Sequence, residues 1–398
     1  MKNVTLSTSI QVASQAKRPQ KEQVRKFIEA LETLPDPRDN RGKKHELAFV
    51  LCCVTLAILS NRSYPSSIQR YIKNRINWLR RVTGRPDAPV VSRAQLPRIL
   101  SVVDVKKLNE LTFNHFGVRV FDEQMDWNAF DGKALRGTPD EQGKQKARIL
   151  TAVNHRTGEI IAQEPINDCK DAEVPTAREV MAQTGLDKEN STMDALYLTP
   201  ELTSQIEQKG GHYIIQVKRN QPLLHERLTA VASSHDPHDI ITHSDKAHGR
   251  HEERLYWFFP LDSFSFADRW ADSGFCTLIV VVRQTIRTND PTKISQELSY
   301  YISNCSLVGG KSFLPESLAQ AIRKHWTVEV INWVRDVTFG EDLVKTKVAN
   351  LAQVLASIRT FAIRLLQRAG IPNFKAAIET FSDCPDLFSR FLHQYHVL

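Results

Sequence analysis

The chain has 398 residues and an ordinary globular composition, with 41% hydrophobic and 25% charged residues. At roughly 100 to 200 residues per domain, this length predicts two or three domains with cores of their own and excludes a small disulfide-stapled scaffold. The 53 basic and 45 acidic residues leave a formal net charge of +8, which is a mild indication of a polyanionic partner.

Residues 1–23 predict a disordered tail without the apolar core of a secretory signal, so we expect a cytoplasmic protein with no membrane partner. The longest apolar run, residues 47–59, is shorter than the roughly 20 residues that cross a bilayer and predicts a buried helix. The six cysteines form no Cys-x-x-Cys pair. We therefore expect reduced thiols and no zinc site.

Residues 24–123 predict a basic, all-helical region. Helices are expected over residues 24–34, 66–82 and 92–103, in a layout that suits a helix-turn-helix-like module, although Pro97 inside the last helix counts against it. Between residues 51 and 100, nine bases stand against one acid, Asp87. This density favours phosphate binding over an ordinary solvated helix face. The bases expected to contact DNA here are Arg75, Arg80 and Arg81.

From residue 126 the pattern changes to short apolar and β-branched runs that alternate with amphipathic segments. Strands are predicted over residues 127–130, 147–153, 159–163, 193–196 and 213–217, and helices over residues 174–184, 200–209 and 222–231. The alternation predicts an α/β domain with a mixed sheet flanked by helices, whose first part covers residues 124–234.

Residues 235–312 hold three further β-rich runs, which predict an inserted β subdomain. These runs cover residues 257–259, 277–283 and 298–303. Helical periodicity returns at residues 317–333 and 351–366, so residues 313–370 are expected to complete the α/β domain. Residues 371–398 remain as a C-terminal tail.

Three acidic residues interrupt apolar segments, where a carboxylate is structurally costly. Asp131 follows directly on the strand predicted at residues 127–130, and Asp194 interrupts the apolar segment 193–198. Glu329 lies on an otherwise apolar helix. A carboxylate buried alone costs several kcal/mol and favours its protonated form.

Taken singly, each acid is most simply interpreted as a strand-end residue or as the partner of a nearby cation. The candidate cations are Lys133, Lys218 and Arg335. If all three acids converge, however, their mutual repulsion would require divalent cations to hold them together. Oxygen-only ligands suit Mg²⁺ or Mn²⁺, and two such ions support in-line phosphoryl transfer.

A series of motifs occurs in a characteristic order along the chain. The motifs are Phe130-Asp-Gly-Lys-Ala-Leu-Arg-Gly137, Met193-Asp-Ala-Leu196, Gly210-Gly-His-Tyr-Ile-Ile-Gln-Val-Lys218 with Asn220-Gln221, His248-Gly-Arg250, and the long block from His325 to Asp342. Together they resemble the ISAs group of bacterial insertion-sequence transposases, which includes the H-repeat-associated proteins and belongs to the DDE superfamily. Residues 36–42 and 92–100 are similar to the N-terminal associated region of that group.

This resemblance implies an RNase H-like catalytic domain split by a β-rich insertion. By position in the motifs, Asp131, Asp194 and Glu329 would be the catalytic triad and the ligands of two Mg²⁺ or Mn²⁺ ions. The resemblance also implies cleavage at terminal inverted repeats and transfer of the 3′-hydroxyl to target DNA. Double-stranded DNA, as transposon ends and as target, would be the partner of a homodimer or a larger assembly.

Several residues depart from the pattern of the group. Tyr197 and Asn332 each replace a usual His, and Ala172 replaces an Asn. Further departures are Ala349 for Gly, and Lys345 and Lys347 for Arg. No departure removes a metal ligand. They leave open an inactive or domesticated DNA-binding protein of the same fold, and sequence does not separate a transposase from a nuclease without strand transfer.

Four basic residues near the predicted site are expected to contact DNA, namely Lys133, Arg136, Lys218 and Arg250. For Lys133 and Arg136, pairing with Asp131 is nearly as good an interpretation. His325 is expected either to position water or a phosphate or to be a structural residue. Helical spacing predicts that Trp326 and Trp333 pack in the core around Glu329.

Overall fold

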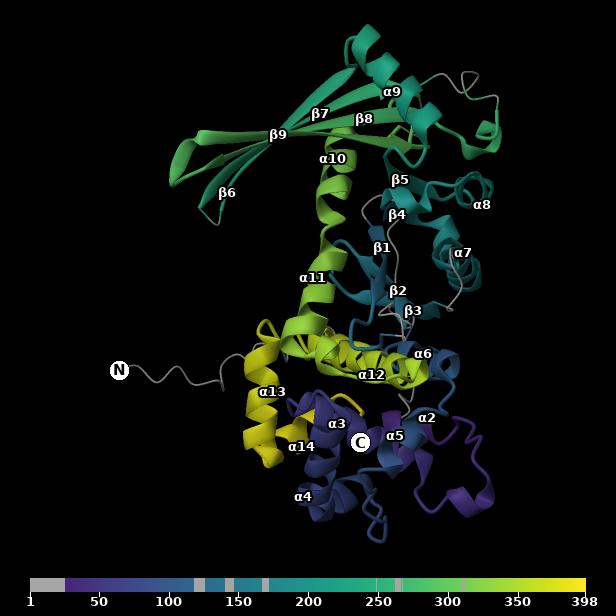
Figure 1. Ribbon diagram of the computed structural model, residues 1–398, viewed down its shortest axis with the longest axis vertical. Helices are drawn as coiled ribbons and strands as arrows, with labels where there is room; N and C mark the ends of the chain where they lie inside the picture. Colours follow the sequence, from purple (N-terminus) through teal and green to yellow (C-terminus); the bar gives the residue numbers. More distant parts are fainter. Residues whose placement is uncertain are drawn as a thin grey trace.

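The computed structural model describes residues 26–117, 126–139, 147–166, 172–247, 249–261, 266, 268–309 and 312–398. The tail predicted at residues 1–23 and His248 of the fourth motif lie outside these residues. Figure 1 shows three parts along the long axis, with a helical region at one end, a sheet in the middle and an arm of long strands at the other end.

The helical region is built around α3 (Leu47–Leu59), in which every residue is buried. A helix that is apolar on all sides needs a covered position, and the neighbouring helices provide it. These are α2 (Phe27–Leu31), α4 (Pro65–Thr83), α5 (Gln95–Leu100), α6 (Val105–Asn114), α12 (Ala349–Arg368), α13 (Phe374–Asp383) and α14 (Pro385–Gln394). The buried helix predicted from the longest apolar run is confirmed.

The helix predicted over residues 92–103 is shorter than expected, because α5 begins at Gln95 and ends at Leu100. Pro97 is tolerated as its third residue, since the first turn of a helix needs no backbone N–H donor. Between Thr83 of α4 and Gln95, 11 residues intervene (84–94), whereas a helix-turn-helix joins its helices by three or four. The prediction of a helix-turn-helix-like layout is therefore wrong.

One mixed sheet of nine strands, in the order β3-β2-β1-β4-β5-β9-β8-β7-β6, forms the middle of the molecule and the arm. Its first five strands are β1 (Trp127–Ala134), β2 (Arg148–Asn154), β3 (Ile160–Ile166), β4 (Asn190–Met193) and β5 (His212–Val217). The β1 strand pairs antiparallel with β2 and parallel with β4, and β4 pairs parallel with β5. This order agrees with the α/β, RNase H-like class that we predicted.

Helices cover both faces of these first strands. On one face lie α7 (Glu173–Thr184), α8 (Pro200–Lys209) and α9 (Pro222–Ser234), whose apolar residues share a core with the sheet. On the other face, α10 (Pro315–Lys324) continues into α11 (Thr327–Trp333) and runs down to α12, as Figure 1 shows. The sheet is thus buried between two helical layers, as expected for strands that run partly in parallel.

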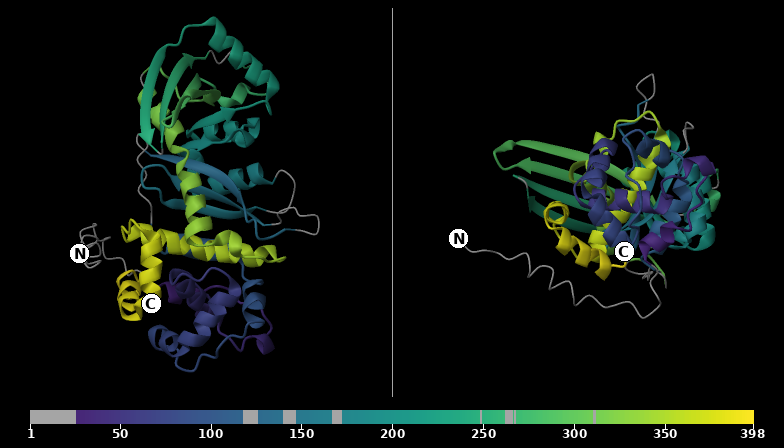
Figure 2. Two further views of the ribbon diagram at one scale, coloured as in Figure 1. Left: turned by 60° about the vertical axis from the view of Figure 1, so that its left-hand side comes forward. Right: turned by 90° about the horizontal axis from the view of Figure 1, so that it is seen from below.

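The β-rich insertion extends the same sheet and adds no separate layer. Its strands are β6 (Asp239–Ala247), β7 (Arg250–Pro260), β8 (Thr277–Arg287) and β9 (Asp290–Ser303), and β9 pairs antiparallel with β5. The first six residues of β8 are buried, and the rest are half-buried or exposed. The outer halves of these strands therefore project as the arm seen in Figure 2.

Residues 371–398, for which the sequence suggested only a tail, form α13 and α14 and pack into the helical core. Asn373 caps α13 by accepting a hydrogen bond from the backbone of Ala376, and Pro385 begins α14. The backbone N–H of Phe27 donates to the carbonyl of His396 at 2.8 Å. In the part of the chain that is described, no helix is both long and apolar enough to cross a membrane.

Candidate active site

The first two predicted acids lie at equivalent places on neighbouring parallel strands. Asp131 was expected after a strand ending at Phe130, but β1 continues to Ala134, with Asp131 opposite Thr151 of β2. Pairing with β2 thus extends β1 beyond its apolar residues 127–130. The register pairs Phe130 with Met193 of β4, so Asp131 and Asp194 each follow a residue of the same pair. The sheet therefore brings these two acids together.

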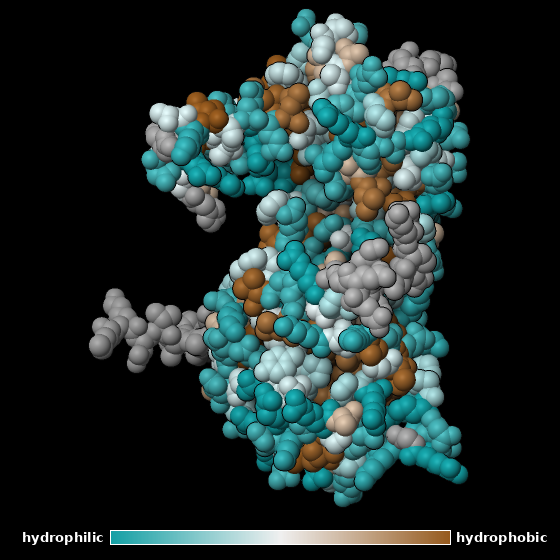
Figure 3. Space-filling model, in the orientation of Figure 1, coloured by the Kyte–Doolittle hydropathy of each residue, from teal (hydrophilic) through white to brown (hydrophobic). Residues whose placement is uncertain are grey.

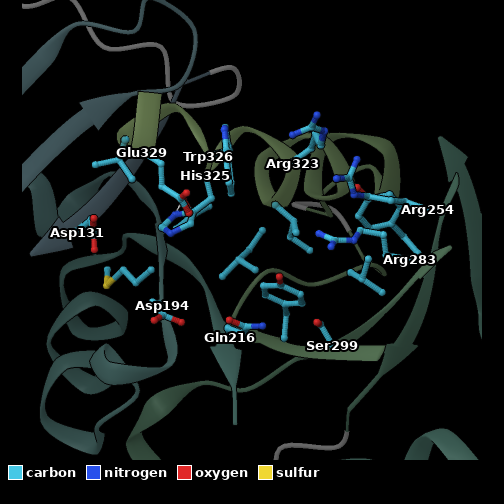
Figure 4. Close-up of a pocket in the computed structure, with 18 of the residues that line it drawn as sticks. Asp131, Asp194, Gln216, Arg254, Arg283, Ser299, Arg323, His325, Trp326 and Glu329 are labelled. Atoms are coloured by element: carbon cyan, nitrogen blue, oxygen red, sulfur yellow. Dashed lines mark hydrogen bonds between the residues drawn. The ribbon is translucent and has the colours of Figure 1, made fainter. Parts of the chain in front are cut away.

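Asp194 stands where β4 ends and a short 3₁₀ helix, η4 (Ala195–Tyr197), begins. One of its carboxylate oxygens, Oδ1, accepts a hydrogen bond from the backbone N–H of Ala195 at 2.7 Å. Glu329 lies in the first turn of α11 and is exposed. Figure 4 shows Glu329 on the same side of a cavity as Asp131 and Asp194.

All three acids line one cavity of about 470 Å³, shown in Figure 4. Thr192, Lys218 and His325 line the cavity beside the acids. Its opposite side belongs to the arm and to α10, and its cations are Arg254 of β7, Arg283 of β8 and Arg323 of α10. We call the two sides the acidic wall (Asp131, Asp194, Glu329) and the arginine wall (Arg254, Arg283, Arg323).

The carboxylates of the acidic wall influence one another. Burial, with the neighbouring charges of Glu173, Glu329 and Asp194, raises the pKa of Asp131 to about 6. Burial and the charge of Asp194 also raise the pKa of Glu329. Burial acts on Asp194 in the same sense, but the Lys218 ammonium, 2.8 Å from Oδ1, outweighs it and lowers the pKa of that carboxyl.

Two residues that contact this wall were not selected from the sequence. Asn332, identified there only as a departure from the family pattern, donates from its side-chain amide to Asp131 Oδ2 at 3.0 Å. Glu173 is buried beneath Asp131, where it accepts a hydrogen bond from the Tyr197 hydroxyl at 2.7 Å. A Cβ atom at Gly132 would lie 2.2 Å from the Glu173 carboxyl group, so the glycine leaves the room that this side chain occupies.

The donor chemistry of the acidic wall fits hard divalent cations, because all three side chains offer carboxylate oxygens. A cation would also relieve the repulsion that contributes to the raised pKa of Asp131. Among the residues described, however, no three or more His, Cys, Asp or Glu side chains are grouped as a metal site. Binding of a cation would therefore bring the three carboxylates closer together. It would also replace the contact of Lys218 with Asp194 and that of Asn332 with Asp131.

Lys133 was predicted to contact DNA, and its surroundings contradict this. Its side chain is only 8% exposed, and its ammonium lies 2.7 Å from Asp336, 3.0 Å from Glu341 and 3.6 Å from Asp342. Arg335, fully buried, lies 3.8 Å from the other side of Glu341. These ion pairs hold the segment after α11 against β1. The Lys133 ammonium is occupied by the three carboxylates and is not available to a DNA phosphate.

The other predicted DNA contacts near the site are exposed but dispersed. The side chain of Arg136 is 78% exposed, with Nε 4.0 Å from Asp342. Lys218 lies inside the cavity on Asp194. Arg250 does not line that cavity and stands with Arg287 at the tip of the arm.

The bases predicted on the helical region lie along α4. Arg75 donates to the carbonyl of Ser382 at 3.2 Å, and Arg80 donates to the carbonyl of Ala88 at 3.0 Å, so both partly serve the fold. Arg81 is exposed.

Trp326 and Trp333 do not pack in the core, as they are 57% and 59% exposed. The prediction of core packing is wrong because α11 faces the hollow side of the molecule, which Figure 3 shows. Helical spacing alone does not tell which face of a helix is covered.

Comparison with known proteins agrees with the resemblance seen in the motifs. Residues 118–365 match the family described as Transposase DDE domain, and residues 28–116 match the family described as DDE_Tnp_1-associated. "H repeat-associated putative transposase YhhI" and "Putative protein YbfL", both of Escherichia coli K12, are each 26% identical over 365 residues, covering 89% of this chain and 93% of theirs. "Putative transposase YncI" of Escherichia coli O157:H7 is 25% identical over 358 residues, covering 86% of this chain and 88% of its own.

The matched family has a characteristic chemistry. DDE transposases act on DNA through nuclease and transferase activity, and they generally use divalent metal ions. The match to the transposase domain covers more than half of the chain and includes all three residues of the acidic wall. The chain therefore belongs to the DDE transposase family.

Proposed function

We propose that this protein cleaves DNA at the ends of an insertion sequence and joins the resulting 3′-hydroxyl to target DNA. Asp131, Asp194 and Glu329 would be the catalytic acids and the ligands of two Mg²⁺ or Mn²⁺ ions. The observation that carries the proposal is their position on one cavity, although they come from two strands and a helix far apart in the sequence. When bound, such ions would activate the attacking hydroxyl and stabilise the leaving oxygen.

The arginine wall supports DNA as the substrate of this cavity. Arg254 and Arg283 are directly opposite each other on β7 and β8, and like charges in this arrangement are unfavourable. Burial and the nearby charge of Arg323 lower the pKa of Arg254, and the charge of Glu252 only partly offsets them. Arg254 is ion-paired with the buried Glu252, and the acids paired with Arg283 and Arg323 lie 3.1 and 3.9 Å away. Phosphates of a DNA strand would reduce this repulsion, so the wall suits a strand that leads to the acids.

Two neighbouring residues hold acids of the acidic wall in place. Lys218 balances the charge of Asp194, and Asn332 orients Asp131 by its hydrogen bond. On release from Asp194, the Lys218 ammonium becomes available for a phosphate of the scissile strand. Arg136 and Arg250 remain proposed DNA contacts at the border of the site and the arm tip, and Arg81, with Arg75 and Arg80 beside it, on the helical region. We further propose that a homodimer or larger assembly forms on the DNA ends.

The test is cleavage of end-sequence DNA in Mg²⁺ by D131N, D194N and E329Q. Each variant is expected to lose roughly 10²- to 10³-fold or more in rate, since a metal ligand supplies several kcal/mol of transition-state stabilisation. D272N, which changes an exposed aspartate on the far side of the sheet, is the matched control and should cleave normally. Undiminished cleavage by any of the three site variants would remove its assignment.

A second candidate is a DNA-binding protein of the same fold that no longer cleaves. Asn332 favours it, because this departure from the family pattern directly contacts Asp131. Salt-sensitive binding of end DNA without any Mg²⁺-dependent cleavage would support this candidate. The DNA that flanks the gene gives an independent test. Short inverted repeats inside a direct target duplication would support mobility, and their absence would favour a domesticated copy.

A further inference from the structure

Three side chains form a hydrogen-bonded series that leads from the interior to the acidic wall. His155 is buried, 7% exposed, at the turn after β2. Its Nε2 lies 3.0 Å from the hydroxyl oxygen of Thr192, and the same oxygen lies 2.9 Å from Nδ1 of His325. His325 lines the cavity beside Glu329, as Figure 4 shows.

The series has one favourable arrangement of hydrogens. Thr192 has a single hydroxyl hydrogen, so it donates to one histidine and accepts from the other. Nδ1 of His155 is buried without a hydrogen-bond partner among the described residues. If that atom carried the hydrogen, a buried donor would be unsatisfied, which is rarer and costlier than an unsatisfied acceptor. His155 therefore donates from Nε2 to Thr192, and Thr192 donates to Nδ1 of His325.

This arrangement leaves the ring hydrogen of His325 on Nε2, the atom on the other side of the ring from Thr192. Burial lowers the pKa of His325, although the charge of Asp194 and the backbone of Thr192 act against it, and burial lowers the pKa of His155 to about 3. Both rings are therefore neutral at neutral pH. Nε2 of His325 has no hydrogen-bond partner within the described part of the chain. A nitrogen that carries a hydrogen cannot ligate a metal ion, but it can donate to an oxygen in the cavity.

The same contacts join the elements that carry two of the acids. Thr192 precedes Asp194 by two residues on β4, and His325 precedes Glu329 by one helical turn. The bond between Thr192 and His325 thus fixes the start of α11 against the end of β4. His325 and all three acids line the same cavity.

We propose that His155 and Thr192 are positioning residues that hold His325 as a neutral Nε2–H donor to a phosphate oxygen of the DNA strand in the cavity. The identity of that oxygen rests on the proposed function, whereas the tautomer does not. His325 is then a contact to the substrate and takes no part in metal ligation.

The tautomer is tested on the full chain labelled with ¹⁵N-histidine, by long-range ¹H–¹⁵N spectra at pH 7.5. H155Q and H325Q assign the two signals by their loss. The expected result is a neutral ring with hydrogen on Nε2 for both residues, retained in T192S. In the isosteric variant T192V, His325 should become a mixture of tautomers. Hydrogen on Nδ1 of His325, or a charged ring, in the wild-type protein would overturn the proposal.

The contact to the substrate is tested by single-turnover cleavage of end DNA at saturating concentration. H325A is expected to lose about 10²-fold, as for other preorganised donors, and H325Q to recover about tenfold because its amide replaces the Nε2–H. T192V should lose about tenfold and T192S little. H235A, at an exposed histidine after α9, is the control. Cleavage by H325A or T192V within threefold of wild type would contradict the proposal.

The two proposals fail separately. Full cleavage by D131N, D194N and E329Q would remove the proposed function, and the tautomer measurement would still decide how His325 is held. If H325A and H325Q lost equal activity, with equal losses in melting temperature, His325 would be structural and the phosphate contact would be wrong.

Discussion

The two walls of the cavity are built in opposite ways. The acidic wall stands on the centre of the sheet, and ion pairs of Lys133 and Arg335 with buried Glu341 support it from behind. The arginine wall stands largely on the long outer strands, next to residues that are half-buried or exposed. Chemistry that needs fixed geometry thus rests on the well-buried part of the sheet. Binding that needs only charge rests on the part of the sheet with less burial.

The largest effect is expected from removing the charge behind the acidic wall. E341A leaves Lys133 and Arg335 buried without their shared partner, which typically costs about 3–5 kcal/mol. The free energy of unfolding in urea measures this loss. E226A, on the exposed side of α9, should stay within about 0.5 kcal/mol. Equal values for the two variants would mean that the acidic wall has no such support.

The second prediction concerns the pH dependence of the free energy of unfolding. Among the described residues, buried His155 contacts Thr192 next to the acidic wall and has no contact with the arginine wall. Its pKa is lowered to about 3, below the usual 6.5, so the unfolded chain takes up the proton first as pH falls. Stability is therefore complete above pH 6.5 and decreases as pH falls toward 3, by about 3 kcal/mol at pH 4.

Urea unfolding of wild type and H155Q between pH 4 and 7.5 measures this dependence. H155Q keeps an amide donor for Thr192 but does not titrate, so its stability should depend less steeply on pH. Parallel profiles for the two proteins would show that His155 is not the group responsible.

The third prediction concerns the packing of Asp131 on the buried acid beneath it. The new methyl group of G132A would lie 2.2 Å from the Glu173 carboxyl group, and overpacking of this kind costs about 1–3 kcal/mol. Cleavage should fall with it, because Asp131 is the neighbouring residue. The double variant G132A/E173A should regain part of the stability. A double variant no better than the sum of the singles would place the strain elsewhere.

The smallest single effects are expected on the arginine wall. R254A, R283A and R323A should each weaken DNA binding by about tenfold or less, and each should lower the slope of log K against log salt by about one. At saturating DNA, the cleavage rate should stay near that of wild type, in contrast to the acidic wall. A variant with an unchanged salt slope would show that its arginine does not neutralise a phosphate.

The sequence predicted the acidic wall better than the arginine wall, for a physical reason. Asp131 and Asp194 interrupt apolar segments. Because burial of a carboxylate costs several kcal/mol, an acid in such a segment stands out in the sequence. Arg283 and Arg323 lie on the polar half of a strand and on a helix surface, where a cation is ordinary. Their common orientation depends on strand register and on the packing of α10, which only tertiary structure determines.

Other differences have the same origin. The β6 strand was not predicted because its exposed residues are mostly polar and give no apolar run. Lys133 was expected to contact DNA or to pair with Asp131 because it follows that residue closely, yet three carboxylates that follow α11 bury it. Asn332 was visible only as a replaced histidine, and its contact with Asp131 requires the helix to pack on β1.

The position of α3 has a consequence for how the protein is made. Its 13 buried residues are all apolar except Thr55, and α12, one of the helices that cover them, begins 290 residues after α3 ends (349 − 59). At about 5–20 residues per second, a ribosome needs roughly 15–60 s to synthesise that interval. Throughout this time the nascent chain exposes apolar side chains of α3 that α12 later covers. The yield of folded protein should therefore depend on chaperones that bind nascent polypeptides.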